Sequence, residues 1–477
     1  MSASAVAADR SVCAPLPVLG RDVLVPLVTG GEVDYAALDY AASAPALQRV
    51  WDDVAAYAPY YGSVHRGAGY LSQLSTDLFE NSRRTVAEFL GCGIEGGTGE
   101  ARSGKGGGGR REGDQVVFTR STTDSLNLLA SVLPQGTRVF VFETEHHASL
   151  LPWEQRPDVT VTYLNAPRTP QQAVDTLEKA LAAREPYGPA LVCVTGASNV
   201  TGELWPVREL AAAAHAHGAR IVLDAAQLVP HHPVDLGELD VDWVAFSGHK
   251  LYAPFGAGVL AGRADWLKDA APYLAGGGAS RKVSRRTDGG VDVEWHTTAA
   301  RHEAGSPNVI GVYAIASACR ALTEAGFDGL VAREQELITR LRTGLAEVPE
   351  VTVLSLFGDD AARVGVLSFV VDGWNSSHFA AALSAEYGIG VRDGLFCAHP
   401  LVRTLLGTAP QDPGECGAPD AAPGEKSLNA IRVSVGVGTP DEHVDRFTRA
   451  VKELVTQGAR WNYRTEDGRC VPARSAD

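Results

Sequence analysis

The sequence predicts an α/β protein with two lobes, a larger one built on a mainly parallel β-sheet and a smaller α+β lobe at the C-terminal end. Three observations predict this fold class. The chain has 477 residues, which is too long for one simple core. Short, continuously apolar runs alternate with helical patterns between about residues 115 and 260, as in parallel sheets covered on both faces. After residue 306, long amphipathic stretches are followed by shorter apolar runs.

The larger lobe is expected to contain six buried strands, because their apolar residues are continuous rather than alternating. The segment 206–219, between the runs 190–196 and 220–226, is expected to be a helix with Pro206 at its first position and Gly218 at its end. Ligands of parallel sheets bind beyond the carboxyl ends of the strands. Polar residues directly after apolar runs are therefore the candidates for function. The six runs are 115–120, 137–143, 159–164, 190–196, 220–226 and 241–248.

The smaller lobe is expected to begin with a long amphipathic helical region over 306–345 and to end with a helix near 440–457. Between them lie three apolar runs that predict strands, at 351–356, 364–371 and 430–437. We therefore predict an N-terminal segment, 1–45, that packs with the small domain, a large domain over 46–315, and a small domain over 316–477.

Two segments have the composition of loops. Residues 93–114 are glycine-rich and charged and are expected to form a flexible loop. Residues 407–427 are rich in proline, glycine and alanine and read as an insertion.

Composition excludes several classes of function. The chain has 42 Lys and Arg against 57 Asp and Glu, a net charge of -15 that argues against nucleic-acid binding. No apolar run approaches the roughly 18 residues of a membrane helix, and residues 1–20 lack the pattern of a signal peptide. The seven cysteines are scattered without a C-x-x-C pair. We expect neither disulfides nor a zinc site, and a reducing cytoplasm fits best.

Two charged residues stand at the ends of neighbouring predicted strands. Asp224 closes the run 220–224, and Lys250 follows the run that ends near Ser247. Taken alone, the aspartate could be a helix cap, and the lysine could be a surface charge that closes a turn. Together, an amine and a carboxylate are the minimal equipment of a pyridoxal phosphate (PLP) site. The amine forms a Schiff base, and the carboxylate keeps the pyridine nitrogen protonated.

A phosphate site is also indicated. Ser121, Thr122 and Thr123 lie between a predicted strand and a predicted helix. Hydroxyl groups and free amides at a helix N-terminus suit an anionic phosphate. A single triplet of this kind could also be simple N-capping.

Nine stretches, in order, resemble those of class V, fold-type I PLP enzymes, and within them the cysteine desulfurase and selenocysteine lyase group. The resemblance implies a large PLP domain with a mainly parallel seven-stranded sheet, a smaller C-terminal domain, an amino-acid substrate, and a homodimer in which both subunits line each site. The stretches are YAALDYAASAP (35–45), YGSVHRGAGYLS (61–72), TRSTTDSLN (119–127), ETEHHASLLPW (143–153), GASNVTGE (196–203), LDAAQ through GVL (223–260), RHEAGSPN (301–308), GVRDGLFCAHPLV (390–402) and IRVSVGVGT (431–439).

The resemblance implies cofactor roles for matching residues. Lys250 would be the Schiff-base lysine, Asp224 the partner of the pyridinium nitrogen, and Gln227 a hydrogen-bond partner of the phenolic oxygen. His146 would stack on the ring and shuttle a proton. The phosphate would be held by Thr122, Thr123, Ser247 and His249, with Ser306 reaching across from the other subunit, and Asn199 would lie beside the cofactor.

Substrate roles follow from the same resemblance. Asn199 and Arg432 would receive the substrate carboxylate, the arginine bidentately. His65 and Arg392 match positions near the pocket, although a buried, hydrogen-bonded histidine and a surface arginine are alternatives. Cys397, in R-x-G-x-x-C-A-x-P-L, matches the nucleophile loop. Its neighbours could favour a thiolate, whereas an inert buried cysteine is the alternative.

The implied function is that of a cysteine desulfurase or selenocysteine lyase, which converts L-cysteine to L-alanine and leaves a persulfide on Cys397 for a sulfur-acceptor protein. Three departures from the family pattern put the substrate in question: Leu395-Phe396 where histidine is usual, Val437-Gly438 where Tyr-Asn is usual, and the 407–427 insertion. The alternative is another class V enzyme, a C–S lyase, aminotransferase or epimerase, in which Cys397 is not the nucleophile. A third alternative is a non-catalytic PLP-binding protein. We expect no metal site, since His231 and His232 resemble a metal-binding pair only superficially.

Overall fold

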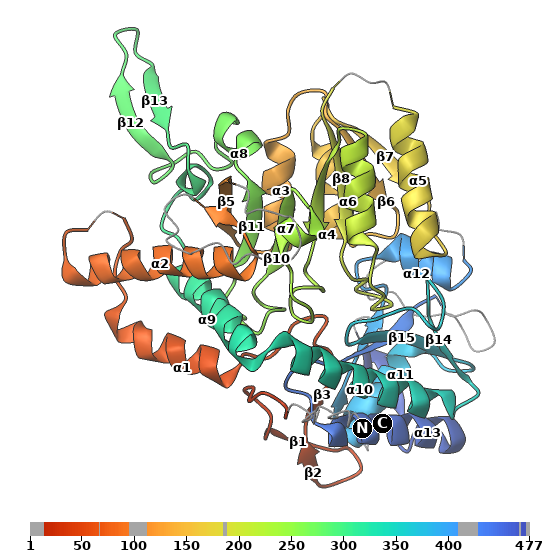
Figure 1. The fold of residues 1–477 in the computed structure, drawn as a ribbon. Coiled ribbons are helices and arrows are strands. Elements are labelled where there is room, and N and C mark those ends of the chain that lie inside the picture. Colours follow the sequence, from red (N-terminus) through yellow and green to blue (C-terminus); the bar gives the residue numbers. More distant parts are fainter. Residues whose placement is uncertain are drawn as a thin grey trace, which may run out of the picture.

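The structure is a computed structural model, and it describes residues 14–65, 67–94, 112–184, 188–408, 428–466 and 469–473. In the described chain, a large sheet with helices on its faces occupies the upper part of Figure 1, and a smaller sheet with its own helices lies below it. This arrangement confirms the α/β fold class.

The large sheet has eight strands in the order β4-β5-β11-β10-β9-β8-β6-β7. Every neighbouring pair is parallel except those of β11, which runs antiparallel to both β10 and β5. The six strands predicted from apolar runs are present. β11 and the two-residue edge strand β4 were not predicted, so the sheet has eight strands where the family resemblance implied seven. The bounds are β4 (Gly93–Ile94), β5 (Glu112–Thr119), β6 (Arg138–Phe142), β7 (Thr160–Leu164), β8 (Ala190–Thr195), β9 (Arg220–Asp224), β10 (Trp243–Ser247) and β11 (Gly258–Arg263).

Helices connect the strands of this sheet. The predicted helix at 206–219 is α6 (Val207–Ala216), with Pro206 as its N-cap, one residue outside the expected start. Gly218 takes φ +67°, and its N–H donates to the carbonyl of His215, which ends the helix. The remaining helices here are α3 (Thr122–Ser131), α4 (His147–Leu150), α5 (Pro170–Ala182), α7 (Leu236–Leu239) and α8 (Asp265–Asp269), with short 3₁₀ turns η2 (Pro152–Gln155) and η3 (Ala299–His302).

The long helical region over 306–345 is two helices, α9 (Val309–Ala325) and α10 (Phe327–Ala346). Gly326 separates them with φ +82°, a conformation that the other residues rarely adopt. α9 packs against α1 (Gln48–Tyr57) and α2 (Tyr70–Phe89), beside η1 (Ala58–Tyr60) (Figure 1). The domain boundary predicted at 316 lies inside α9, and the division of the chain into domains stays a prediction.

The smaller sheet is antiparallel, with the order β14-β15-β18-β17. Its face is covered by α10, α11 and α13, which bury Phe369, Phe379 and Phe447. The last predicted helix is α13. The bounds are β14 (Val351–Val353), β15 (Val366–Val371), β17 (Arg392–Gly394), β18 (Ala430–Ser434), α11 (Ser376–Tyr387), α12 (His399–Leu405) and α13 (Asp441–Gln457).

The N-terminal segment lies between both lobes. After the hairpin β1 (Leu24–Pro26) and β2 (Glu32–Asp34), strand β3 (Ala36–Ala37) pairs in parallel with β16 (Ile389–Gly390). A few residues later, Ala44 donates its N–H to the carbonyl of His249 at 2.9 Å. Asp39 forms a parallel bridge with Ser434 at the end of β18, so the segment contacts the small sheet and also reaches the candidate lysine region.

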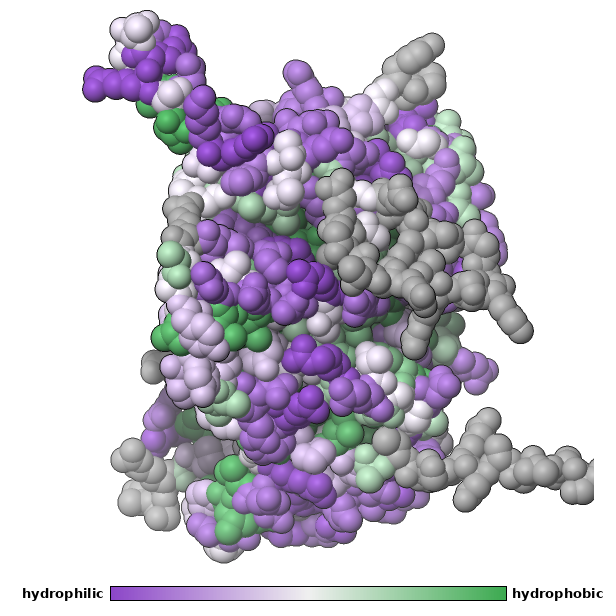
Figure 2. Space-filling view, turned by 60° about the vertical axis from the view of Figure 1, so that its left-hand side comes forward, coloured by the Kyte–Doolittle hydropathy of each residue, from purple (hydrophilic) through white to green (hydrophobic). Residues whose placement is uncertain are grey.

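Two further hairpins were not predicted. One, β12 (Ser280–Arg285) and β13 (Val291–Trp295), stands clear of the body, and its tip is mainly hydrophilic on the face shown in Figure 2. The other, β19 (Tyr463–Glu466) and β20 (Arg469–Pro472), ends the described chain.

The predicted loop at 93–114 is partly structured, because its ends form β4 and the start of β5. Residues 95–111 of that loop and 409–427 of the predicted insertion lie outside the described residues. No helix in the described ranges is long and apolar enough to cross a membrane.

Candidate active site

Asp224 lies at the carboxyl end of β9, where the parallel sheet places it beside the end of β10. Its side chain is buried, and each carboxylate oxygen accepts a hydrogen bond, one from Ser149 Oγ at 2.5 Å and one from the Ala226 N–H at 2.9 Å. Both donors are neutral. In the described chain Asp224 forms no ion pair, so this buried carboxylate is suited to a cationic N–H from a bound group.

Lys250 follows β10 in the turn that leads to β11. Burial lowers the pKa of its amine to about 8, against the opposing attraction of Asp224. Arg432 lowers this pKa further, whereas Cys397 raises it, so the three groups each act on the Lys250 amine. With this pKa, about a tenth of the amine is unprotonated at pH 7, far more than for an ordinary lysine, as a nucleophile or base requires.

His146 precedes α4 and caps it, because its Nδ1 accepts the Ala148 N–H at 3.0 Å. Nδ1 therefore carries no proton, and the proton of the neutral ring is on Nε2. Burial lowers the pKa of His146 to about 3, and the charge of Lys250 adds to this effect. The ring is neutral at physiological pH and can present a flat face to an aromatic ligand.

The predicted phosphate residues meet at the N-terminus of α3. The Thr122 N–H donates to Ser247 Oγ at 2.7 Å, and the two hydroxyl groups are 2.8 Å apart. Gly258 permits this arrangement, since a Cβ there would lie 2.6 Å from the Ser121 Cα. Thr123 is exposed on the first turn. Free amides at a helix N-terminus favour an anion.

His249 and Gln227 are two further residues of the predicted cofactor site. Burial lowers the pKa of His249, so its imidazole is neutral. Gln227 is buried, and its Nε2 donates to the carbonyl of Ala41 at 2.7 Å. The glutamine therefore fastens the N-terminal segment over the site.

Arg432, on β18, is buried and connects three groups. Its Nη1 donates to the carbonyl of Asn199 at 3.0 Å, and its Nη2 donates to Asp39 Oδ1 at 3.0 Å. Its guanidinium carbon lies 4.9 Å from the centre of the Phe396 ring. The buried Nε–H has no hydrogen-bond partner in the described part of the chain. A buried cation with an unused donor is suited to a ligand carboxylate.

Cys397 lies in a backbone held under strain. Phe396 and Cys397 both have φ +52°, which costs free energy for residues other than glycine. Three contacts hold this loop: the His147 N–H donates to the Cys397 carbonyl at 2.8 Å, Asn199 Nδ2 donates to the Phe396 carbonyl at 2.9 Å, and the rings of His147 and His399 meet edge to face at 4.5 Å. The Cys397 side chain is half-buried, and it influences the pKa values of Lys250 and Arg432.

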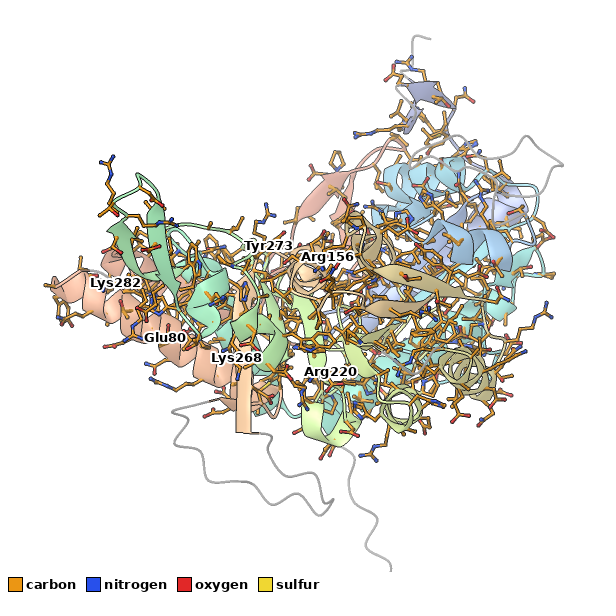
Figure 3. All side chains as sticks on the ribbon, turned by 90° about the horizontal axis from the view of Figure 1, so that it is seen from above. Glu80, Arg156, Arg220, Lys268, Tyr273 and Lys282 are labelled. Atoms are coloured by element: carbon orange, nitrogen blue, oxygen red, sulfur yellow. The ribbon has the colours of Figure 1, made fainter. Side chains whose placement is uncertain are left out.

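The predicted site residues are thus largely together, with two exceptions, His65 and Ser306. Arg392 is exposed on β17, and its register with Arg432 on β18 places it at the edge of the site. His65 pairs with Glu80 at 2.8 Å and lines a surface groove that also contains Lys268; Figure 3 places Glu80 on α2 and Lys268 on α8.

Ser306 is the second exception. It is exposed beside Pro307, which lines the same groove as His65. No hydrogen bond or ion pair of the described chain links His65 or Ser306 to Lys250.

Sequence reasoning missed three residues that shape the site: Asp39, Glu145 and Ser149. Glu145 is fully buried, and its Oε1 accepts the Thr195 N–H at 3.0 Å. Burial and the charge of Asp224 raise the pKa of Glu145 well above its usual value, so it is neutral. Asp39, Glu145 and Ser149 all lie inside the stretches that resemble the family, and this position could have marked them as site residues.

These groups fit PLP by their chemistry. The buried carboxylate of Asp224 suits the pyridinium, the helix N-terminus at Thr122 suits the phosphate, and the amine of Lys250 suits the aldehyde. The neutral ring of His146 suits the face of the cofactor.

The family model for aminotransferase class V matches residues 36–96 and 109–447. A cysteine desulfurase of Enterobacter sp. (strain 638) is 35% identical over 93% of this chain and 98% of its own length. A probable cysteine desulfurase of Halobacterium salinarum is 36% identical over 83% and 89%. The apo structure of a Thermococcus onnurineus cysteine desulfurase superposes with a TM-score of 0.73, at 29% identity, over 88% of this chain and 95% of that one. The chain belongs to the aminotransferase class-V family of PLP-dependent enzymes, in its cysteine desulfurase group.

Proposed function

We propose that this chain is a PLP-dependent cysteine desulfurase that converts L-cysteine to L-alanine and leaves a persulfide on Cys397. One observation carries the proposal beyond the family. The half-buried Cys397 is held in a strained backbone next to Lys250 and Arg432. A cysteine retained for packing needs no such geometry.

The chain's own residues would hold the cofactor as follows. Lys250 would bind it covalently, Asp224 would pair with the ring nitrogen, and His146 would stack on the ring. Thr122 and Ser247, with Thr123 and His249, would hold the phosphate. Gln227, whose amide also donates to the Ala41 carbonyl, would donate to the phenolic oxygen. When bound, PLP supplies a ring that accepts electrons from the substrate.

The substrate steps use four residues. Arg432 and Asn199 bind and orient the carboxylate. The unprotonated amine of Lys250, freed by the incoming substrate, accepts the α-proton. The Cys397 thiolate then attacks the substrate sulfur. A sulfur–sulfur bond forms, the carbon–sulfur bond breaks with its electron pair left on carbon, and that carbon takes up a proton to become the alanine methyl group.

A homodimer would complete the site. His65 lines a groove whose lining does not include Lys250, and Ser306 is exposed next to Pro307 of the same groove. Their exposure supports a role in the partner's site, with Ser306 on the phosphate. Arg392, exposed beside Arg432, would assist the carboxylate of the substrate at the entrance. Selenocysteine as a second substrate, a protein acceptor for the persulfide, and a cytoplasmic location belong to the same proposal.

The experiment is incubation of the PLP-loaded protein with L-cysteine, followed by quantification of alanine, sulfide and protein-bound persulfide. We expect Cys397→Ala to abolish persulfide and alanine formation, and Cys470→Ala, at another half-buried cysteine, to change neither. The alternative is a C–S lyase, aminotransferase or epimerase of the same family. It would be supported if Cys397→Ala formed alanine, pyruvate or a keto acid at the wild-type rate.

A further inference from the structure

Asp39 is a carboxylate that the structure places on the substrate side of the site. Its Oδ1 accepts a hydrogen bond from Arg432 Nη2 at 3.0 Å, and the exposed fractions of the two side chains are 28% and 4%. Its charge also raises the pKa of Lys250. Asp39 therefore contacts Arg432, the residue that we propose binds the α-carboxylate of the substrate.

The backbone holds this carboxylate in place from both sides. Asp39 forms a β-bridge with Ser434, two residues beyond Arg432 on β18. The Ser434 N–H donates to the carbonyl of Leu38 at 2.8 Å, and the Ala41 N–H donates to Ser434 Oγ at 2.9 Å. The Asp39–Arg432 pair is consequently part of the junction between the N-terminal segment and the small sheet rather than an accidental surface contact.

The guanidinium has partners before any substrate arrives. One N–H of Nη1 donates to Asn199, one N–H of Nη2 donates to Asp39, and Phe396 covers a face. The buried Nε–H has no partner in the described part of the chain, so the cation keeps donors for a ligand while its charge is already paired. A substrate carboxylate is therefore a second anion on a cation that is already neutralised, and like charges that share one partner repel each other.

We propose that Asp39 is an internal counter-anion that limits the affinity of Arg432 for the α-carboxylate of amino acids. Substrate and product carry the same carboxylate, so this restraint weakens both and favours the departure of alanine. The inference rests on the proposed function for the identity of the product. It adds a specificity-determining role for a residue of the N-terminal segment.

The test compares Asp39→Asn with the wild-type holoenzyme. Asparagine keeps the shape and an oxygen that accepts from Nη2, and it removes the charge. We expect the dissociation constant of L-alanine, measured by calorimetry, to fall about fivefold. The KM of L-cysteine should fall with it, and inhibition by L-alanine should become stronger. Binding of ethylamine, which has no carboxylate, should not change.

Two control variants keep the test decisive. Glu32→Gln removes the same charge from an exposed position of the same segment and should leave L-alanine binding unchanged. Asp39→Glu retains the charge and should bind L-alanine like the wild type, with the absorbance of bound PLP reporting that each variant is folded. Weaker L-alanine binding in Asp39→Asn, or an equal change for ethylamine, would overturn the proposal. If L-cysteine yields no alanine, the proposed function fails, while the L-alanine titration still decides the role of Asp39.

Discussion

Replacing Arg363 by methionine should destabilise the protein by about 3 to 5 kcal/mol, the usual cost of removing one partner of a buried ion pair. Arg363 Nη2 lies 3.2 Å from Glu203 Oε1, and the exposed fractions of the two side chains are 2% and 0%. Glu203 follows β8 of the large sheet, and Arg363 precedes β15 of the small sheet. The pair therefore also connects the two sheets.

The size of the loss in unfolding free energy follows from the buried charge that the substitution leaves on Glu203. Glu203 still accepts from the N–H groups of Leu356 and Phe357, at 2.9 and 2.8 Å, and from Ser355 Oγ at 2.7 Å. Its hydrogen bonds survive, but its charge stays buried without a counter-charge. For a folding unit of roughly 150 to 250 residues, a loss of about 3 kcal/mol lowers the melting temperature by about 6 to 12 °C.

The assay is thermal unfolding of the holoenzyme, with urea unfolding as a check. Glu347→Gln breaks the exposed Lys452–Glu347 pair, which has an N–O distance of 3.1 Å, and should cost less than about 1 kcal/mol. The double variant Glu203→Leu with Arg363→Met should be less destabilised than the sum of the single variants, because neither charge is then stranded. Equal losses for Arg363→Met and Glu347→Gln would refute the argument from burial.

Three further outcomes are expected. In the PLP-free protein, Lys250 should be half-labelled by an amine-selective reagent near pH 8, since burial lowers its pKa to about 8; half-labelling near pH 10 would contradict this. Glu145→Gln should become increasingly stabilised relative to wild type as pH rises above about 4.5, because the raised pKa keeps the folded Glu145 neutral while the unfolded one ionises; parallel unfolding midpoints from pH 5 to 8 would count against it. Gly202→Ala should destabilise more than Gly136→Ala in thermal unfolding. Both glycines have φ +73°, but only at Gly202 would the added Cβ meet a backbone atom, the Val366 carbonyl oxygen, at 2.3 Å; equal effects would exclude the clash as the cause.

The local pattern of apolar residues, prolines and glycines was sufficient to predict most strands of the large sheet and the helix α6. Continuous apolar runs predicted β5 to β10, and the Pro206 and Gly218 signals bounded α6 to within one residue. β11 was missed because Gly256 and Gly258, which follow Lys250 within eight residues, are typical of a loop. Gly258 is nevertheless part of the strand, because only a residue without a Cβ lets its backbone lie so close to Ser121. The hairpin β12–β13 was missed because its residues are mostly exposed and polar, so no apolar pattern marks it.

The sequence by itself determined the fold class and the cofactor chemistry, and it predicted roles for Lys250, Asp224 and Cys397, because strand ends and motif order are properties of consecutive residues. Only the tertiary structure decided that Asp39 meets Arg432 across 393 positions, that Glu145 is buried and feels the charge of Asp224, and that His65 lines a groove whose lining does not include Lys250. Charges and hydrogen bonds act through space at distances of a few ångström. Which distant residues come that close is set by the packing of the two sheets and of the N-terminal segment between them.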